Sequence, residues 1–377
     1  MAYVAVSGGK EAIEASIRLL DLYKSGTDKD IETEAIENKL SLLVDRVMSE
    51  AGLYSKAYAA LALKQCEGSV EEAVFLLRAY RSTLARNYYT DIVDTEAMRV
   101  VRRISAAFKD ITGGQMLGAS YDYTHRLIDF GNGGANPAGL RKAMLDEIAA
   151  QTPEEAAQYP RVSDALKDEG LIDRSEQDDQ KPHDVTAHML EFPAERSARL
   201  QTLSRADTGF ISGVAYSALR GFGQVHPTVG ELRCGYAELY VPYGPSGMGE
   251  PGNPGNPGGS GENESIYIGE ILITEVECFN SAEDNHPRAS RHPSAEGNRL
   301  KLAVGYGAVF GRNENKAIAM AVIDHELNAG GPYPAQNEEF VLTHGDSLEM
   351  NGFVSHLKLP HYVTFQSKLD AVRRTRE

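Results

Sequence analysis

The chain has 377 residues, a hydrophobic content of 42% and a formal net charge of −16. That length is enough for one large domain or two ordinary ones. The negative charge disfavours non-specific binding to nucleic-acid phosphate, while leaving room for a local basic pocket. No apolar run approaches the roughly 20 residues of a membrane span, and we see no secretion signal at the N-terminus. We therefore expect neither a nucleic-acid nor a membrane partner.

Cysteine usage favours a reducing compartment. Cys66, Cys234 and Cys278 are scattered, odd in number and not in the spacing of a metal-ligating set. We expect reduced thiols in a cytoplasmic protein, serving as small core residues rather than as nucleophiles.

The first third of the chain is predicted to be mainly helical. After a short strand expected at residues 3–6, apolar residues recur at helical spacing through residues 10–110. The segment 68–72, Gly-Ser-Val-Glu-Glu, is typical of a turn that leads into a capped helix. These helices form a layer whose apolar stripes need a partner surface.

The stretch 102–126 combines three cations, a Gly-Gly loop and a tyrosine-rich segment with a carboxylate and an imidazole. The residues concerned are Arg102, Arg103, Lys109, Asp122 and His125. This combination suits a polyanion that carries a sugar or a base. The alternative is a solvated helix face followed by a surface turn.

Residues 131–195 have a different character and are interpreted as a connector. Polar, glycine-rich loops flank one short helical stretch at 160–171. His183 and His188 lie five positions apart here, in polar surroundings that favour a surface role over metal binding.

Order returns at Arg196, where a helix is predicted. Beyond it, Arg220, His226 and Arg233 lie among glycines, which would let the backbone approach a ligand closely. A glycine-rich hairpin with exposed charges is an equal alternative.

Two low-complexity loops, 242–262 and 281–299, flank the clearest strand, which spans 266–277. Glu275 and Glu277 share one face of that strand, because side chains alternate with period two. Paired carboxylates stabilise positive charge at an anomeric carbon or activate water, although such a pair is more often a solvated strand face. A strand at 306–311 and an amphipathic helix at 313–327 follow.

The segment 353–361, Phe-Val-Ser-His-Leu-Lys-Leu-Pro-His, places His356 and His361 five positions apart. Pro360 pushes Leu359 toward an extended conformation. We therefore expect a short strand through His356 that bends at Pro360 and brings both imidazoles to one point. Two neutral imidazoles suit zinc, with His344 or Asp346 as possible further ligands. The alternative is two histidines that hydrogen-bond to the backbone.

Several collinear segments resemble the PhnI family, the I subunits of the bacterial carbon–phosphorus lyase core complex. The matching segments cover most of residues 1–130 and 196–377 and are found at 61–65, 75–81, 102–106, 109–115, 121–127, 226–231, 340–342 and 353–362. The connector and the two low-complexity loops depart from the family pattern.

The resemblance implies phosphonate catabolism. A member of this family is expected to displace the base of ATP or GTP at ribose C1, and partner subunits install methylphosphonate there. The products are ribose 1-methylphosphonate 5-triphosphate and adenine, which makes the protein a transferase in the complex and a purine nucleotide nucleosidase when alone. The implied partners are the G, H and J subunits and the ATPase-like K and L subunits.

The resemblance also implies site roles. His356 and His361 match the family's zinc pair, and Mg²⁺ accompanies the nucleotide. We expect Glu275, Asp122 and His125 to be catalytic, and the substrate to be bound by Arg102, Arg103, Lys109, Arg220, His226 and Arg233. The rival interpretations are a non-catalytic scaffold subunit pinned by zinc and an unrelated metal hydrolase.

The fold class expected is α+β, with a helical N-terminal layer followed by a mixed or antiparallel sheet with helices. We expect a mainly helical domain at 1–130, a variable connector at 131–195 and an α+β domain with the metal site at 196–377.

Overall fold

The computed structural model describes residues 9–26, 30–128, 130, 137–150, 159–173, 182–223, 226–243, 264–281 and 301–376. The chain divides into two compact units, each assembled from separated segments. Unit 1 contains Met1–Ala85, Pro182–Gly223 and Gly330–Glu377, and unit 2 contains Arg86–Lys181 and Gln224–Ala329. The contiguous domains 1–130, 131–195 and 196–377 stay a prediction. The strand expected at 3–6 and most of the two low-complexity loops lie outside the described residues.

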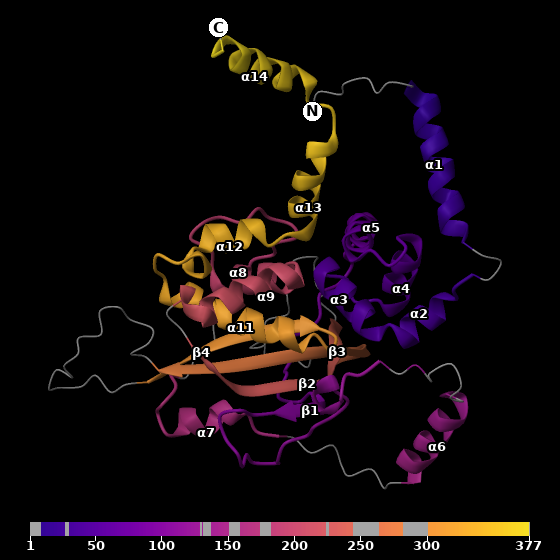
Figure 1. Ribbon diagram of the computed structural model, residues 1–377. Helices are drawn as coiled ribbons and strands as arrows, with labels where there is room; N and C mark the ends of the chain where they lie inside the picture. The colour runs from indigo at the N-terminus through magenta and orange to yellow at the C-terminus, as the bar shows by residue number, and fades with distance from the viewer. Residues whose placement is uncertain are drawn as a thin grey trace, which may run out of the picture. The chain divides into compact units, whose positions relative to one another are not determined.

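Unit 1 is helical in its described residues (Figure 1). Its helices are α1 (Gly9–Ser25), α2 (Thr33–Lys39), α3 (Ser41–Ala51), α4 (Lys56–Gln65), α5 (Val70–Thr83), α8 (Arg196–Arg205), α9 (Thr208–Ser217), α12 (Glu338–His344), α13 (Ser347–Ser355) and α14 (Tyr362–Arg374). Short helical turns are η2 (Ala218–Phe222), η3 (Pro334–Gln336) and η4 (His356–Lys358).

Helices α2 to α5 enclose an apolar core of small and branched side chains. Val47, Met48, Ala59, Ala73 and Val74 are among the buried residues that pack together there. Serine caps begin two of the helices, as the sequence predicts at 68–72: the side-chain oxygens of Ser55 and Ser69 accept hydrogen bonds from backbone amides three residues on.

Unit 2 is built on one antiparallel sheet. The strands β1 (Arg99–Ile104), β2 (Thr228–Tyr243), β3 (Glu264–Ser281) and β4 (Leu302–Phe310) lie in the order β1-β2-β3-β4. Within the described residues of unit 2, the helices are α6 (Pro137–Ala150), α7 (Val162–Asp168) and α11 (Glu314–Ala329), and η1 (Tyr121–Tyr123) is a single turn. The α+β class is therefore confirmed, and the sheet is antiparallel.

Helix α11 runs along the sheet beside β3 and β4 (Figure 1). Glycines in β4 permit this close approach, because a Cβ atom at Gly307 would lie 2.2 Å from the carbonyl oxygen of Ala317, and one at Gly305 would lie 2.3 Å from that of Ala321. Ala317, Met320 and Ile323 are buried, in agreement with the amphipathic helix predicted at 313–327.

Residues 10–110 are not helical throughout, and this prediction is wrong at β1. The arginines of the strand Arg99–Ile104 suggest a solvent-exposed segment from the sequence. In the folded unit, however, Arg102 and Arg103 are buried, and each forms an ion pair with a glutamate. The stretch around Arg233 is likewise not a short hairpin but part of β2, which pairs with both β1 and β3.

Helices at 160–171, from Arg196 and at 313–327 are confirmed as α7, α8 and α11, and the C-terminal segment forms helix α14. None of the helices in the described ranges is long and apolar enough to cross a membrane.

The close packing of α11 on β4 can be tested at Gly307. Gly307→Ala should lower the free energy of unfolding by about 1–3 kcal/mol, because its methyl group would overlap the backbone of α11. Urea denaturation followed by circular dichroism measures the change. Gly213→Ala in α9 is the matched control, since a Cβ atom there meets nothing within 4 Å, and should leave stability unchanged or raise it by up to about 1 kcal/mol. Equal midpoints for Gly307→Ala and wild type would contradict the packing argument.

Candidate functional site

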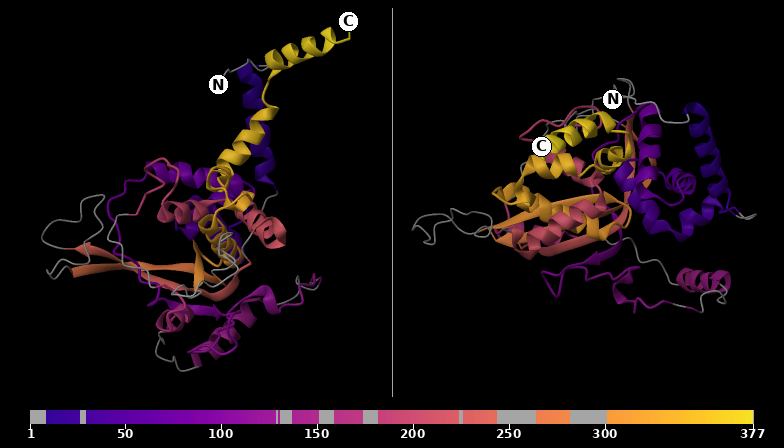
Figure 2. Two further views of the ribbon diagram at one scale, coloured as in Figure 1. Left: turned by 90° about the vertical axis from the view of Figure 1, so that its left-hand side faces the viewer. Right: turned by 45° about the horizontal axis from the view of Figure 1, so that its top comes forward.

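A helix break places His356 and His361 on either side of Pro360. Asp346 caps α13 by accepting hydrogen bonds from the amides of Leu348 and Glu349, at 2.9 Å and 3.2 Å. The helix ends at His356, Leu359 is extended (φ −76°, ψ 155°), and α14 begins at Tyr362. The strand expected through His356 is therefore wrong, because the segment continues a capped helix. The chain bends between α13 and α14 (Figure 2), and the extended residue Leu359 before Pro360 marks the bend.

The two imidazole rings lie together at this bend. Their centroids are 5.2 Å apart, with an angle of 62° between the ring planes. A zinc ion about 2.1 Å from two imidazole nitrogens in tetrahedral geometry sets the ring centroids roughly 5 Å apart. The observed separation therefore fits two imidazoles that share one ion.

Backbone carbonyls fix the protonation pattern of both rings. His356 Nδ1 faces the carbonyl of Phe353, and His361 Nδ1 lies 2.6 Å from the carbonyl oxygen of Leu359. A carbonyl only accepts hydrogen bonds, so each neutral ring carries its proton on Nδ1 and keeps a lone pair on Nε2. The same arrangement orients metal-ligating histidines in general, so backbone bonding and metal binding are compatible here.

The described residues supply an incomplete ligand set for the histidine pair. Within the part of the chain that the structure describes, no group of three or more His, Cys, Asp or Glu residues is arranged to hold a metal. His344 and Asp346 therefore do not complete the histidine pair, contrary to expectation. His344 Nδ1 lies 2.8 Å from the carbonyl oxygen of Phe340, and Asp346 pairs with Arg78. Among the described residues, the histidine pair therefore has no third protein ligand, and water, substrate or another chain could occupy the remaining positions.

Exposed apolar side chains surround the histidine pair. Phe353, Leu357, Val363 and Phe365 are each more than half exposed on α13, η4 and α14. Clusters of exposed large apolar residues are a common mark of protein–protein contact surfaces.

In unit 2, the buried ion pair between Arg103 and Glu231 forms hydrogen bonds to several separate segments of the chain. Arg103 and Glu231 pair with each other, and each side chain is 1% exposed. The other nitrogens of Arg103 donate to the carbonyls of Thr112 and Pro160, at 2.5 Å and 2.8 Å, and Glu231 accepts from the amide of Val162 at 3.0 Å. The pair therefore holds the loop before Gly113 and the start of α7 against the sheet.

Beside that pair lies a less satisfied cluster of charges. Glu275 accepts from the Tyr306 hydroxyl at 2.9 Å and from Arg161 at 3.2 Å, and Arg161 also pairs with Glu277 at 3.5 Å. Arg233 is 3.8 Å from Glu275, which is too long for a hydrogen bond. Polar atoms of Arg233, Glu275 and Glu277 have no hydrogen-bond partner in the described structure. Unsatisfied buried polar atoms of this kind are rare and often mark a functional site.

Burial controls the ionisation of this cluster. It raises the pKa of Glu277, and the neighbouring Glu275 carboxylate raises it further, although Arg161 opposes both effects. The pKa of Tyr306 is likewise raised by burial and by Glu275. The pKa of Arg161 rises because Glu275 and Glu277 outweigh the desolvation of its guanidinium group.

A third group of charges reaches the surface of unit 2. Arg102 is buried and contacts Asp122 at 2.6 Å; its Nε is 2.7 Å from Glu314 in an ion pair without hydrogen-bond geometry. Asp122 is 52% exposed and also lies 3.6 Å from Arg126. The predicted cation Arg102 and the predicted carboxylate Asp122 are therefore direct partners.

The remaining predicted site residues are exposed side chains. Lys109, His125 and His226 belong to unit 2, and Arg220 belongs to unit 1. Their roles, like those of Arg103, Arg233 and Glu275, stay predictions. Sequence reasoning missed Arg161, which lies 114 positions from Glu275 and joins it only after folding. The sequence signal that pointed to such a residue was the shared strand face of Glu275 and Glu277, because two neighbouring carboxylates that become buried need a cation as partner.

A family model and curated relatives agree on one family. A family model described as "Bacterial phosphonate metabolism protein (PhnI)" matches residues 2–377. The chain is similar to the putative C-P lyase subunit protein HtxH of Stutzerimonas stutzeri, with 42% identity over 387 residues that cover 100% of this chain and 96% of the relative. It is also similar to the alpha-D-ribose 1-methylphosphonate 5-triphosphate synthase subunits PhnI of Escherichia coli (strain K12), with 42% identity covering 100% of this chain and 98% of the relative, and of Rhizobium meliloti (strain 1021), with 41% identity covering 99% and 95%.

The raised pKa of Glu277 predicts a pH-dependent stability difference. The folded state favours the protonated carboxyl, so this contribution to stability is present below the ordinary Glu pKa and is lost as pH rises through the raised value. Glu277→Gln does not titrate. Its stability relative to wild type should therefore increase as the pH rises from about 4 to about 8. Urea denaturation at several pH values measures this, and a difference that falls with pH would contradict the assignment.

Proposed function

Because the chain belongs to the PhnI family of bacterial phosphonate metabolism proteins, we propose that it is the nucleosidase-like subunit of a carbon–phosphorus lyase assembly. In this proposal it displaces the base of ATP or GTP at ribose C1. Methylphosphonate is then attached at C1 with the help of partner subunits.

The name of the relatives' product supports this chemistry. Alpha-D-ribose 1-methylphosphonate 5-triphosphate, named for the Escherichia coli and Rhizobium relatives, has the ribose triphosphate of ATP with a phosphonate at C1 in place of adenine. Exchange at C1 breaks the C1–N bond to the base and forms a C1–O bond to methylphosphonate, and adenine leaves with a proton. When water replaces methylphosphonate, the same substitution releases adenine from ATP and makes the chain alone a purine nucleotide nucleosidase.

Loss of the base develops positive charge at C1, which a carboxylate stabilises. Exposure supports Asp122 for this role over Glu275. Asp122 is 52% exposed beside Arg102, whereas Glu275 is 2% exposed and is held by Tyr306 and Arg161. His125 lies three residues from Asp122 and is also exposed, so it can assist in protonating the leaving base.

Two exposed side chains of unit 2 support triphosphate binding. Lys109 and His226 are both exposed, and Mg²⁺ normally accompanies a nucleotide triphosphate. The donors of Arg103 are already used by Glu231 and by backbone carbonyls, which supports a role for Arg103 in shaping the region. Arg233 in unit 2 and Arg220 in unit 1 stay predicted anion contacts.

The geometry of His356 and His361 supports zinc binding by unit 1. Zinc there would supply a Lewis acid with open coordination positions. Because the described residues offer only this pair, and because exposed apolar side chains surround it, we propose that a companion subunit covers the site. The G, H, J, K and L subunits are the proposed companions, and the reduced state of Cys66, Cys234 and Cys278 supports a cytoplasmic assembly.

Release of free base from ATP tests the proposed activity. The purified chain with Mg²⁺ and ATP should release adenine, measured by liquid chromatography. Asp122→Asn should lower kcat/KM by about 100-fold or more, because the carboxylate no longer faces the developing charge. Glu270→Gln is the matched control, since Glu270 forms a comparable exposed ion pair with Arg99, and should retain activity.

Three outcomes would contradict this assignment. Absence of base release favours the alternative in which the chain is a zinc-pinned scaffold. Release of inorganic phosphate without adenine favours a metal hydrolase. Full activity of Asp122→Asn would show that another residue supplies the catalytic carboxylate. Metal analysis of His356→Ala belongs to the same experiment, and its zinc content should fall well below that of wild type.

A further inference from the structure

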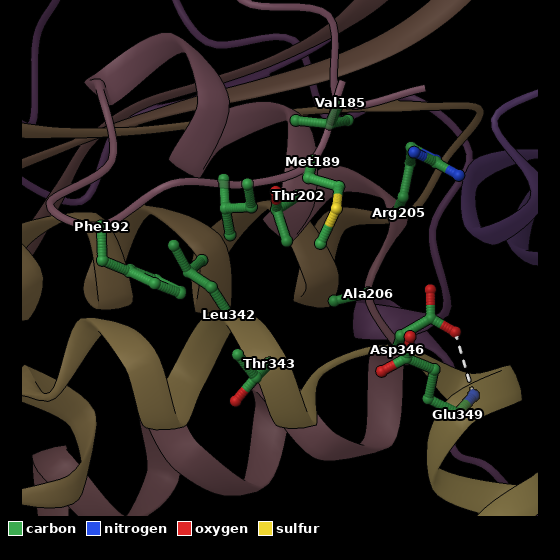
Figure 3. Close-up of a pocket in the computed structure, with 11 residues that line it drawn as sticks. Val185, Met189, Phe192, Thr202, Arg205, Ala206, Leu342, Thr343, Asp346 and Glu349 are labelled. Carbon is green, nitrogen blue, oxygen red and sulfur yellow. Dashed lines mark hydrogen bonds between the residues drawn. The ribbon is translucent and has the colours of Figure 1, made fainter. Parts of the chain in front are cut away.

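Unit 1 contains a cavity that neither the histidine pair nor the proposed nucleotide chemistry uses. It has a volume of about 390 Å³ and lies among the segment 185–192, α8, α12 and the start of α13. Volumes of this size are typical of small-molecule sites. Figure 3 shows two contrasting ends: Phe192 and Leu342 line one end, and Arg205, Asp346 and Glu349 line the other.

The apolar wall belongs to a segment that is attached at both ends. Near its start, the Gln201 side chain of α8 accepts from the amide of Val185 at 3.4 Å and donates to the carbonyl of His183. Near its end, the amide of Ala194 donates to Glu338 at 2.7 Å. Between these attachments Met189, Leu190 and Phe192 line the cavity.

Arg205 is the cation at the charged end, and its charge is poorly compensated. Its Nε atom is buried without a hydrogen-bond partner among the described residues. Burial together with the nearby charges of Arg78 and Arg81 lowers the pKa of Arg205 to about 10, despite the opposing effect of Asp346. Gly52 makes this crowding possible, because a Cβ atom there would lie 2.9 Å from Arg81 Nη1 and 3.2 Å from Arg205 Nε.

Both oxygens of the neighbouring carboxylate Asp346 already have other partners. One oxygen pairs with Arg78, and the other accepts from the amides of Leu348 and Glu349 at the start of α13. Arg78 in turn donates to the carbonyls of Glu50 and Arg205. An anion at Arg205 would therefore add to the partial compensation that Asp346 and Asp184 provide among the described residues.

We propose that this cavity binds a small organic anion, with its anionic group on Arg205 and its aromatic or branched aliphatic part against Phe192, Met189 and Leu342. A guanidinium group binds a carboxylate through parallel hydrogen bonds, and the apolar end gains from excluding water. The site does not depend on the nucleosidase assignment, since no residue of that assignment lines the cavity.

Calorimetric titration of the full chain with 4-phenylbutyrate tests the site. 4-Phenyl-1-butanol, which has the same apolar body without the charge, is the comparison ligand. The acid should bind at least about tenfold more tightly than the alcohol, which corresponds to one charge-assisted contact. Methyl NMR of labelled methionine should show the Met189 signal shifting with the acid, assigned with Met189→Leu. Equal affinity for the acid and the alcohol, or no shift at saturation, overturns the proposal without any need for a variant at the cation.

Variants then locate the charge that binds the acid. Arg205→Met should weaken acid binding by about tenfold and leave alcohol binding unchanged, whereas Arg205→Lys should retain most of the preference for the acid. Arg196→Met is the matched control, because Arg196 is exposed on the same helix and does not line the cavity. Glu349→Gln should tighten acid binding, since it removes a like charge from the cavity wall. Unchanged acid binding in Arg205→Met, or an equal loss in Arg196→Met, would contradict the assignment.

Discussion

The break between α13 and α14 is the constraint on which the proposed metal site depends. Pro360 has no amide hydrogen and restricts the residue before it, so Leu359 leaves the helical conformation. His356 ends one helix and His361 precedes the next, and the extended residue between them turns both rings to one place. A continuous helix would place residues five apart on different parts of its surface. The break therefore brings together two imidazoles, and backbone carbonyls then fix the nitrogen that remains open.

A different constraint organises unit 2, where charges are buried on the sheet. The Arg103–Glu231 pair is surrounded by further hydrogen bonds, which is the condition for tolerating a buried ion pair. The adjoining group of Arg161, Arg233, Glu275 and Glu277 is not fully satisfied. These charged side chains are therefore buried on the sheet without full hydrogen bonding. At the surface, Arg102 positions the exposed Asp122. This contrast supports structural roles for the buried pair and a chemical role for the exposed carboxylate.

Much of the fold follows from sequence patterns that are local. The long strand β3 and helix α11 were predictable because alternation and helical spacing are visible within a dozen residues. Strand β1 was not predictable in this way, since Arg102 and Arg103 resemble a solvated face until Glu314 and Glu231 neutralise them. The segment before Pro360 was mistaken for a strand, although Asp346 offered a helix cap.

The candidate site was only partly visible in the sequence. The imidazole pair could be predicted because its members are close in the chain and Pro360 separates them. The link from Arg161 to Glu275 could not, because it spans 114 positions and depends on α7 docking against the sheet. The cavity beside Arg205 was equally hidden, since its wall combines residues 185–206 with residues 342–349, which strands β2 to β4 separate in the sequence. The hydrophobic periodicity of a sequence indicates which residues are buried. Ion pairs between residues far apart in the sequence can be identified only once the folded structure is known.

X-ray absorption spectroscopy at the zinc edge tests the central claim most directly, using the chain assembled with its companion subunits. The account predicts two imidazole nitrogens at about 2.0–2.1 Å from the metal, with the imidazole scattering reduced in His361→Ala. A spectrum without imidazole ligands, or one that is unchanged in His361→Ala, would contradict the metal site at the Pro360 bend.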